Sequence, residues 1–96
     1  MTHTFEVEQW AFCGGEIREV DIPLAIIPDD TEDILETVYK YGQNEIQAKD
    51  CPSVSMGDII LLEGKKFLVR ITGFQSLTDE TYNGHVNNIN RLRACF

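Results

Sequence analysis

The feature that most constrains the fold is a pair of apolar runs in the second half of the chain, separated by a glycine turn. Residues 59–62 are four consecutive aliphatic side chains, a run typical of a strand buried at least partly on both faces. Gly64 follows and is free to adopt the positive φ of a tight turn. The next residues alternate, which places Phe67, Val69 and Ile71 on the core side. The sequence therefore predicts a β-hairpin here.

Ser53, Ser55 and Asp58 lie just before this hairpin and raise the question of a catalytic or ligand-binding cluster. Ser, Gly and Asp are also the residues that favour a turn before a strand, because their side chains hydrogen-bond the local backbone. The chain has no G-x-S-x-G motif, and its sequence places no base near the serines. We therefore assign a turn role to these residues.

Residues 53–60 read SVSMGDII and are followed by Phe-Leu-Val at 67–69 and Gly-Phe at 73–74. This pattern resembles the C-terminal motif of YodL-like domains, small domains of phage, plasmid and other mobile-element proteins. Residues 38–42 are similar to the tyrosine-rich segment that often precedes the motif, so the resemblance covers between a third and a half of the chain. Arg70 departs from it, because the family commonly has an acidic residue there. The family brings no established catalytic residues, so the resemblance implies an origin rather than an activity.

Length and composition indicate one domain, residues 1–96, with 43% hydrophobic residues. The three cysteines are scattered and form no C-x-x-C pair, which argues against a disulfide framework and favours a reducing, cytoplasmic location. No apolar run reaches the length of a membrane helix, and the N-terminus has no signal-peptide pattern. We therefore expect a cytoplasmic protein, in the host cell if it is phage-encoded, without a membrane partner.

The net charge of −8 is unevenly distributed. Residues 1–36 contain ten acidic side chains and one basic side chain, Arg18. An anionic surface is repelled by phosphate backbones, so we expect no direct nucleic-acid binding. Acidic charge instead favours a basic protein partner. The candidate partner-binding residues are Glu6, Glu8, Glu16, Glu19, Asp29, Asp30, Glu32, Asp33 and Glu36.

The first half of the chain predicts two strands and a helix. Residues 4–12 and 16–22 have strand patterns, with Ile17, Val20 and Ile22 as the apolar positions of the second strand. The acids before residue 34 are typical of a capped helix start, and this explains them better than a metal or acid–base site does. The helix is predicted over 31–42, ending at Gly42.

Other segments give weaker patterns. The apolar residues 23–28 are bracketed by prolines, which predicts an extended segment across the core surface or at an edge. Residues 44–48 predict a short edge strand, and a helix starting near residue 78 is predicted to break at Gly84. Residues 85–96 fit a helix, a strand or an irregular end. The predicted fold is α+β: a curved antiparallel sheet of four to six strands with the 31–42 helix packed on it.

The sequence predicts no enzyme and no cofactor. His3, His85 and the cysteines have no zinc-ligand spacing, and no phosphate-binding glycine motif is present. A small-ligand pocket lined by Trp10, Phe12, Tyr39 and Phe74 is one further hypothesis, although core packing explains these aromatic residues equally well.

Two functions fit these features best. The first is a small acidic binding protein of a phage or mobile element that occupies a host protein's basic surface, as a counter-defence inhibitor or nucleic-acid mimic. The alternative is a structural or accessory module that forms a homodimer, or docks on a larger assembly, through a hairpin edge at residues 63–72.

Overall fold

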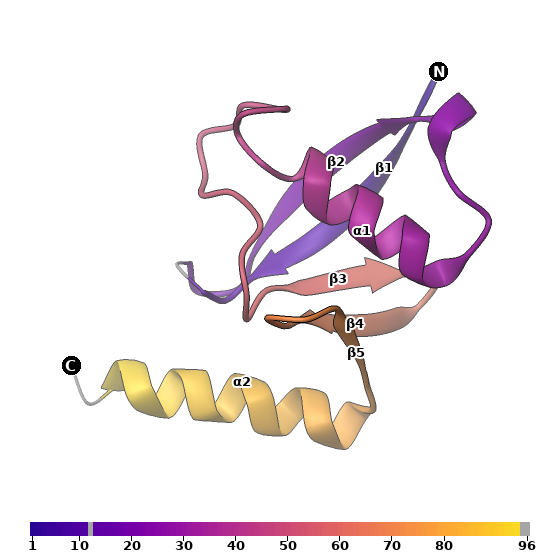
Figure 1. The fold of residues 1–96 in the computed structure, drawn as a ribbon. Helices are drawn as coiled ribbons and strands as arrows, with labels where there is room; N and C mark the ends of the chain where they lie inside the picture. The colour runs from indigo at the N-terminus through magenta and orange to yellow at the C-terminus, as the bar shows by residue number, and fades with distance from the viewer. Residues whose placement is uncertain (12, 95–96) are drawn as a thin grey trace.

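An antiparallel sheet forms the centre of the computed structural model, which describes residues 1–11 and 13–94 (Figure 1). The sheet has five strands in the order β2-β1-β3-β4-β5 within this described part. In chain order the elements are β1 (Thr2–Gln9), β2 (Glu16–Pro23), the 3-10 helix η1 (Leu24–Ile26), α1 (Thr31–Tyr41), β3 (Ile59–Leu62), β4 (Lys65–Val69), β5 (Phe74–Leu77) and α2 (Asp79–Ala94). The predicted α+β class, with a main helix packed on an antiparallel sheet, is confirmed.

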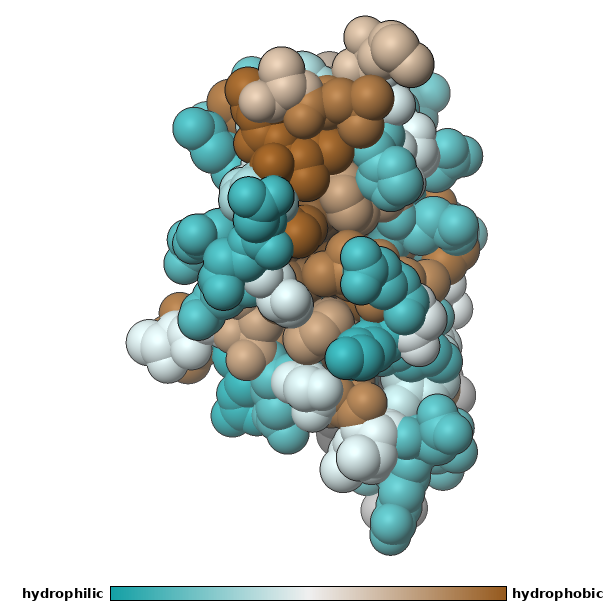
Figure 2. All heavy atoms as spheres, turned by 90° about the vertical axis from the view of Figure 1, so that its right-hand side faces the viewer, coloured by the Kyte–Doolittle hydropathy of each residue, from teal (hydrophilic) through white to brown (hydrophobic). Residues whose placement is uncertain are grey.

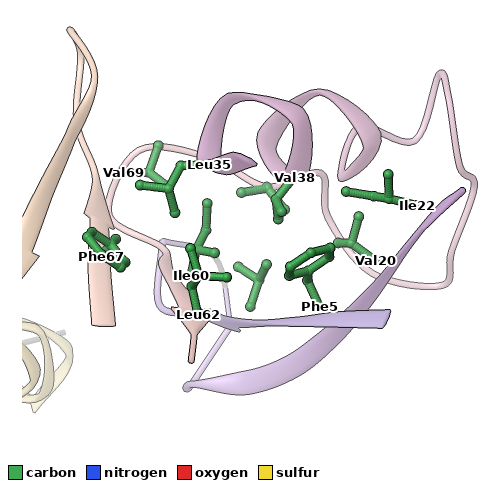
Figure 3. Packing of buried hydrophobic residues seen from close by; sticks show 11 residues of the cluster. Phe5, Val20, Ile22, Leu35, Val38, Ile60, Leu62, Phe67 and Val69 are labelled. Carbon is green, nitrogen blue, oxygen red and sulfur yellow. The ribbon is translucent and has the colours of Figure 1, made fainter. Parts of the chain in front are cut away.

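Alternation along the strands decides which residues enter the core. Phe5, Val7 and Gln9 of β1 are buried on one face, and the residues between them point to the other. α1 packs on the buried face and contributes Leu35 and Val38 (Figure 3). We call this the inner face of the sheet and the opposite one the outer face. The core cluster contains Phe5, Val7, Val20, Ile22, Leu35, Val38, Val54, Ile60, Leu62, Phe67 and Val69.

The helix predicted over 31–42 is confirmed as α1, followed by Gly42. The side chain of Asp30 caps its start by accepting a hydrogen bond from the Asp33 N–H at 3.4 Å. Gly42 has a φ of −78°, so a left-handed conformation is not its reason for being there. A Cβ at this position would lie 2.3 Å from Cγ2 of Val54, so the close approach of the two segments requires glycine.

Arg18 points into the protein, whereas Ile17, one of the apolar positions of this strand, points outward. The side chain of Arg18 is 2% exposed, whereas Ile17 is 47% exposed. The strand register explains this, because Arg18 lies opposite Val7 and therefore shares the inner face with Val20.

The guanidinium of Arg18 is held by neutral oxygens of the connection between α1 and β3. Its Nη1 donates to Asn44 Oδ1 at 2.9 Å and to the Pro52 carbonyl at 2.8 Å, and Nη2 donates to the Gln47 carbonyl at 2.6 Å. Residues 44–48 are therefore not the predicted edge strand. Residues 44–46 form turns and residue 47 a bend, because the polar groups of Asn44 and Gln47 face a buried cation rather than a neighbouring strand.

The turn role predicted for Asp58 is confirmed, and its side chain also binds a second segment of the chain. Its buried carboxylate accepts hydrogen bonds from the N–H groups of Trp10 and Ala11, and from that of Ser55, each at 2.9 Å. Burial raises the pKa of Asp58, and the three backbone donors partly oppose that rise. The residue thus ties the end of β1 to the turn before β3.

The predicted hairpin is confirmed as β3 and β4, joined by a tight turn at Glu63 and Gly64. Both turn residues have positive φ, 50° and 77° respectively, as this class of two-residue turn requires. Ile71 was expected on the core side but is 83% exposed, because the chain turns after β4 and returns as β5. β5 pairs with β4, so most of the hairpin edge expected at 63–72 is covered.

Two further predictions from local pattern are wrong. The proline-bracketed segment 23–28 is not extended throughout, because residues 24–26 form η1, closed by a 3.3 Å hydrogen bond from Ile27 N–H to Leu24 O. α2 does not break at Gly84 but continues to Ala94; Cys95 and Phe96 lie outside the described residues. One glycine inside a helix costs about 1 kcal/mol, and contacts between α2 and the outer face offset that cost.

We expect Arg18→Met to lower the free energy of unfolding by about 2–4 kcal/mol, because three part-buried oxygens would lose charge-assisted donors. Urea unfolding followed by circular dichroism measures the loss. Arg70→Met is the matched control, since Arg70 is exposed and its Nη1 contacts only the Gln75 side chain. Equal losses in the two variants would contradict the structural role of Arg18.

Candidate protein-docking surface

The structure does not bring the nine candidate acidic residues together on one surface. Glu6 and Glu19 lie directly opposite each other on β1 and β2 and point to the outer face. The acidic residues between 29 and 36 lie just before α1 and in its first turns, and α1 packs against the inner face (Figure 1). Glu16 is exposed at the start of β2, opposite the buried Gln9. A partner that binds one of these groups therefore does not contact all of them.

Glu8 is already engaged within the protein. Its Oε1 accepts hydrogen bonds from Trp10 Nε1 at 3.0 Å and from the Tyr82 hydroxyl at 2.6 Å. Lys66 Nζ lies 3.4 Å from the centre of the Tyr82 ring, so α2 is held to the outer face by a carboxylate and a cation. Burial and the Glu8 carboxylate raise the pKa of Tyr82 to about 12. Glu8 therefore has a structural role and is a poor partner contact.

The acidic residues before and within α1 have the local roles expected of them. Asp30 caps the helix, while Glu32 and Asp33 lie in its first turn, where the helix dipole favours negative charge. All are exposed. This arrangement explains their position without a bound ligand.

A different feature forms the best candidate site: a groove between β1, η1 and the β3–β4 turn, with a volume of about 440 Å³. We call it the β1–η1 groove. Its inner wall is apolar, and its rim carries the carboxylates of Glu6 and Glu63. The inner wall contains Phe5, Leu24, Ile27, Ile34 and Leu62, with His3 beside them.

Exposed apolar side chains continue the groove onto the surface. Leu24 and Ile26 of η1 are 48% and 47% exposed, and Met1 is fully exposed. Figure 2 shows hydrophobic residues gathered at the top of the face on which η1 lies. The 3-10 turn causes this exposure, because residues 24–26 contribute no buried side chain. Contiguous apolar surface of this kind marks interaction sites in proteins.

Sequence reasoning missed this site, although a signal was present. The sequence predicts that the apolar residues 23–28 lie across the core surface or at an edge. This run is bracketed by prolines and has no partner strand nearby in the sequence. Such a pattern also fits a segment whose apolar side chains are exposed on the surface.

A second apolar hollow, of about 450 Å³, lies where β4 turns toward β5. Tyr39 and Phe74, two of the four aromatic residues named for a ligand pocket, line it. Trp10 does not line it and instead contacts Glu8, while Phe12 lies outside the described residues. The rest of the lining is Glu36, Met56, Val69, Arg70, Ile71 and Gly73.

Metal-binding and membrane-spanning features are not found in the part of the chain that the structure describes. No three His, Cys, Asp or Glu side chains among residues 1–11 and 13–94 gather closely enough to hold a metal ion. No helix in this part has the length and apolar character needed to cross a membrane.

Comparisons of the chain with protein-family models, with curated proteins and with solved structures gave no match. The resemblance to YodL-like domains therefore stays a prediction from the sequence.

We expect the phenol of Tyr82 to titrate with a midpoint near pH 12, above the ordinary value of 10.0. The folded state holds this proton more tightly than the unfolded chain does, so the stabilising effect is full below pH 10.0 and is lost as the pH rises through about 12. Ultraviolet titration of the phenolate absorbance measures the midpoint. Tyr82→Phe should remove that component, whereas Tyr39→Phe should retain it; retention in both variants would contradict the assignment.

Proposed function

We propose that this chain is a small acidic binding protein that occupies a basic surface of another protein and docks through the β1–η1 groove. The observation that carries the proposal is the groove itself, an open apolar hollow beside exposed Leu24 and Ile26, with Glu6 and Glu63 on its rim. An apolar centre with a charged rim is the common anatomy of protein interfaces.

The two parts of the groove have different roles in binding. Burial of Leu24 and Ile26 against a partner would supply affinity, at about 25 cal/mol per Å² of apolar surface removed from water. The carboxylates select a basic partner and speed its association. The net charge of −8 extends this attraction beyond the groove.

The resemblance to YodL-like domains supports a finer version of the proposal. If the chain comes from a phage or mobile element, its partner is a host protein, and the chain acts as a counter-defence inhibitor. In the nucleic-acid-mimic form of this proposal, exposed carboxylates of the outer face, such as Glu6 and Glu19, would stand where phosphates bind. The α1 carboxylates lie on the other side of the sheet and would not join that row.

The second apolar hollow favours an alternative function, a self-associating or accessory module. Ile71 is 83% exposed and Met56 is 53% exposed beside it. The free edge of β5 lies next to this hollow and takes the place of the hairpin edge expected from the sequence. Self-association would cover these side chains in a homodimer.

The proposed function is tested by capture from nuclease-treated bacterial lysate with the tagged wild type and with Leu24→Asp/Ile26→Asp. We expect a basic protein to be retained by the wild type and to be lost at least about tenfold in the double variant, because its apolar contacts would be replaced by charges. Quantitative mass spectrometry measures the ratio.

Ile71→Asp is the matched control, since it places the same charge on the other apolar hollow. It should retain the captured protein. Loss in Ile71→Asp but not in the η1 variant would move the docking site to the second hollow, and no selective loss in either would contradict a groove-based function.

The alternative predicts a dimer that dissociates in Ile71→Asp, because a carboxylate would then be buried at the interface. Sedimentation equilibrium over a range of protein concentrations measures this. A wild type that is monomeric at the highest concentration would rule out self-association through this surface.

A further inference from the structure

The N-terminal half of β1 has a backbone edge without a partner. β1 begins at Thr2, but its pairing with β3 covers only Glu6 to Glu8. β3 ends at Leu62, and the turn at residues 63–64 then carries the chain away into β4. Thr2 and Thr4 therefore lie beyond the last paired residue of β3, beside the β1–η1 groove.

The direction of these free backbone groups follows from the hydrogen bonds around them. In an antiparallel strand, N–H and C=O of one residue point to the same side, and alternate residues point to opposite sides. The Met1 carbonyl oxygen accepts a hydrogen bond from the Leu24 N–H at 3.1 Å. The backbone N–H and C=O groups of the odd-numbered residues of β1 therefore point toward β2. The backbone N–H and C=O groups of Thr2 and Thr4 consequently point toward the groove. Within residues 1–11 and 13–94 these groups have no hydrogen-bond partner on that side.

The other sheet edges are partly occupied or short. On β2 the side-chain amide of Gln47 accepts a hydrogen bond from the Asp21 N–H and donates one to the Asp21 C=O, both at 2.9 Å. These backbone groups of the β2 edge are therefore already paired. Pro23, the next outward-pointing residue, has no N–H to donate. β5 is only four residues long.

We infer that an extended segment of the partner protein adds as a strand to β1 at Thr2 and Thr4, with apolar and basic side chains alternating along it. The inference rests on the proposed function and specifies its binding mode. Strand addition supplies backbone hydrogen bonds, and the pockets on each face select the side chains.

The two faces of the groove determine the alternation. Phe5 and Leu62, on the inner face, meet Ile27 and Ile34, so side chains of the added strand that point inward contact apolar surface. Glu6 points to the outer face, so side chains on that side contact a carboxylate. Because successive side chains of a strand point to opposite faces, the added strand should alternate apolar and basic residues.

Glu63 adds to the selection of basic side chains. It lies at the groove with a φ of 50°, a conformation that is unfavourable for a residue with a side chain. Asparagine adopts this conformation more readily, so Glu63→Asn should preserve the turn while removing the carboxylate.

Charge also argues against a second copy as the occupant. β2, the longer edge strand of this chain, carries Glu16, Glu19 and Asp21. Pairing it with β1 of another copy would bring these carboxylates toward Glu6 and Glu63. Like charges on neighbouring strands are unfavourable, so a basic segment fits the site better than the chain's own edge.

The test uses a fluorescein-labelled Lys-Val-Lys-Val-Lys-Val peptide and fluorescence anisotropy with the full chain. We expect saturable binding that weakens at least about tenfold in Thr4→Pro, because proline removes the N–H that the added strand needs. Thr4→Val is the control: it keeps the N–H and loses only the side-chain bond to Asp21, so its affinity should stay within about twofold of the wild type. Glu63→Asn should weaken binding while leaving the melting temperature unchanged or raised.

Backbone N-methylation of alternate peptide residues gives an independent readout with the unchanged protein. N-methylation of the alternate peptide residues whose N–H groups pair with Thr4 should abolish binding. Equal binding to Thr4→Pro and Thr4→Val, or equal binding of the methylated peptide, would overturn strand addition, as would failure of the wild type to bind the peptide.

These outcomes are distinct from failure of the proposed function. If the η1 double variant loses a captured partner while the peptide tests fail, the groove binds proteins by another mode. If neither the η1 variant nor the peptide tests show an effect, both proposals are wrong.

Discussion

The buried guanidinium of Arg18 is the interaction on which the arrangement of this molecule depends. A cation removed from water needs several oxygens to replace its hydration. In the described part of the chain these come from the long connection between α1 and β3, through Asn44, Gln47 and Pro52. Binding them draws that connection along the sheet and leads it to the start of β3. A hydrophobic residue at the same position would remove three of the hydrogen bonds that hold this connection and leave those from Gln47 to Asp21 and from Gln9 to Pro52.

Asp58 complements this anchor at the same end of the sheet, where it binds the backbone after β1. One end of the sheet is thus closed by two buried polar centres, each with several hydrogen bonds. The opposite end, where β1 extends past β3, has no comparable centre among the described residues and is lined by apolar side chains. The β1–η1 groove is a consequence of this asymmetry, because the polar contacts that close one end leave the strand edge and apolar surface at the other uncovered.

The same contacts determine how charge is displayed. Arg18 is buried, Lys49 lies 3.9 Å from Asp21, and Lys66 is over the Tyr82 ring. Three of the basic side chains are therefore engaged within the fold, while most acidic side chains of the described residues remain exposed. The protein presents a negative field to its surroundings even though its strands contain cations. This separation connects the folding role of the basic residues to the proposed preference for a basic partner.

The sequence by itself determined the elements whose signals are local. The alternation of β1, the capped start of α1 and the Glu63–Gly64 turn each follow from neighbouring residues, and together they give the α+β class. Tertiary structure decided what depends on distant partners. The strand register placed Arg18 inside and Ile17 outside, against hydrophobicity, because acceptors more than twenty residues away were in reach. The candidate site belongs to this second group: its groove exists because β1 is longer than its neighbour β3, and strand lengths across a sheet are fixed only when the strands pair.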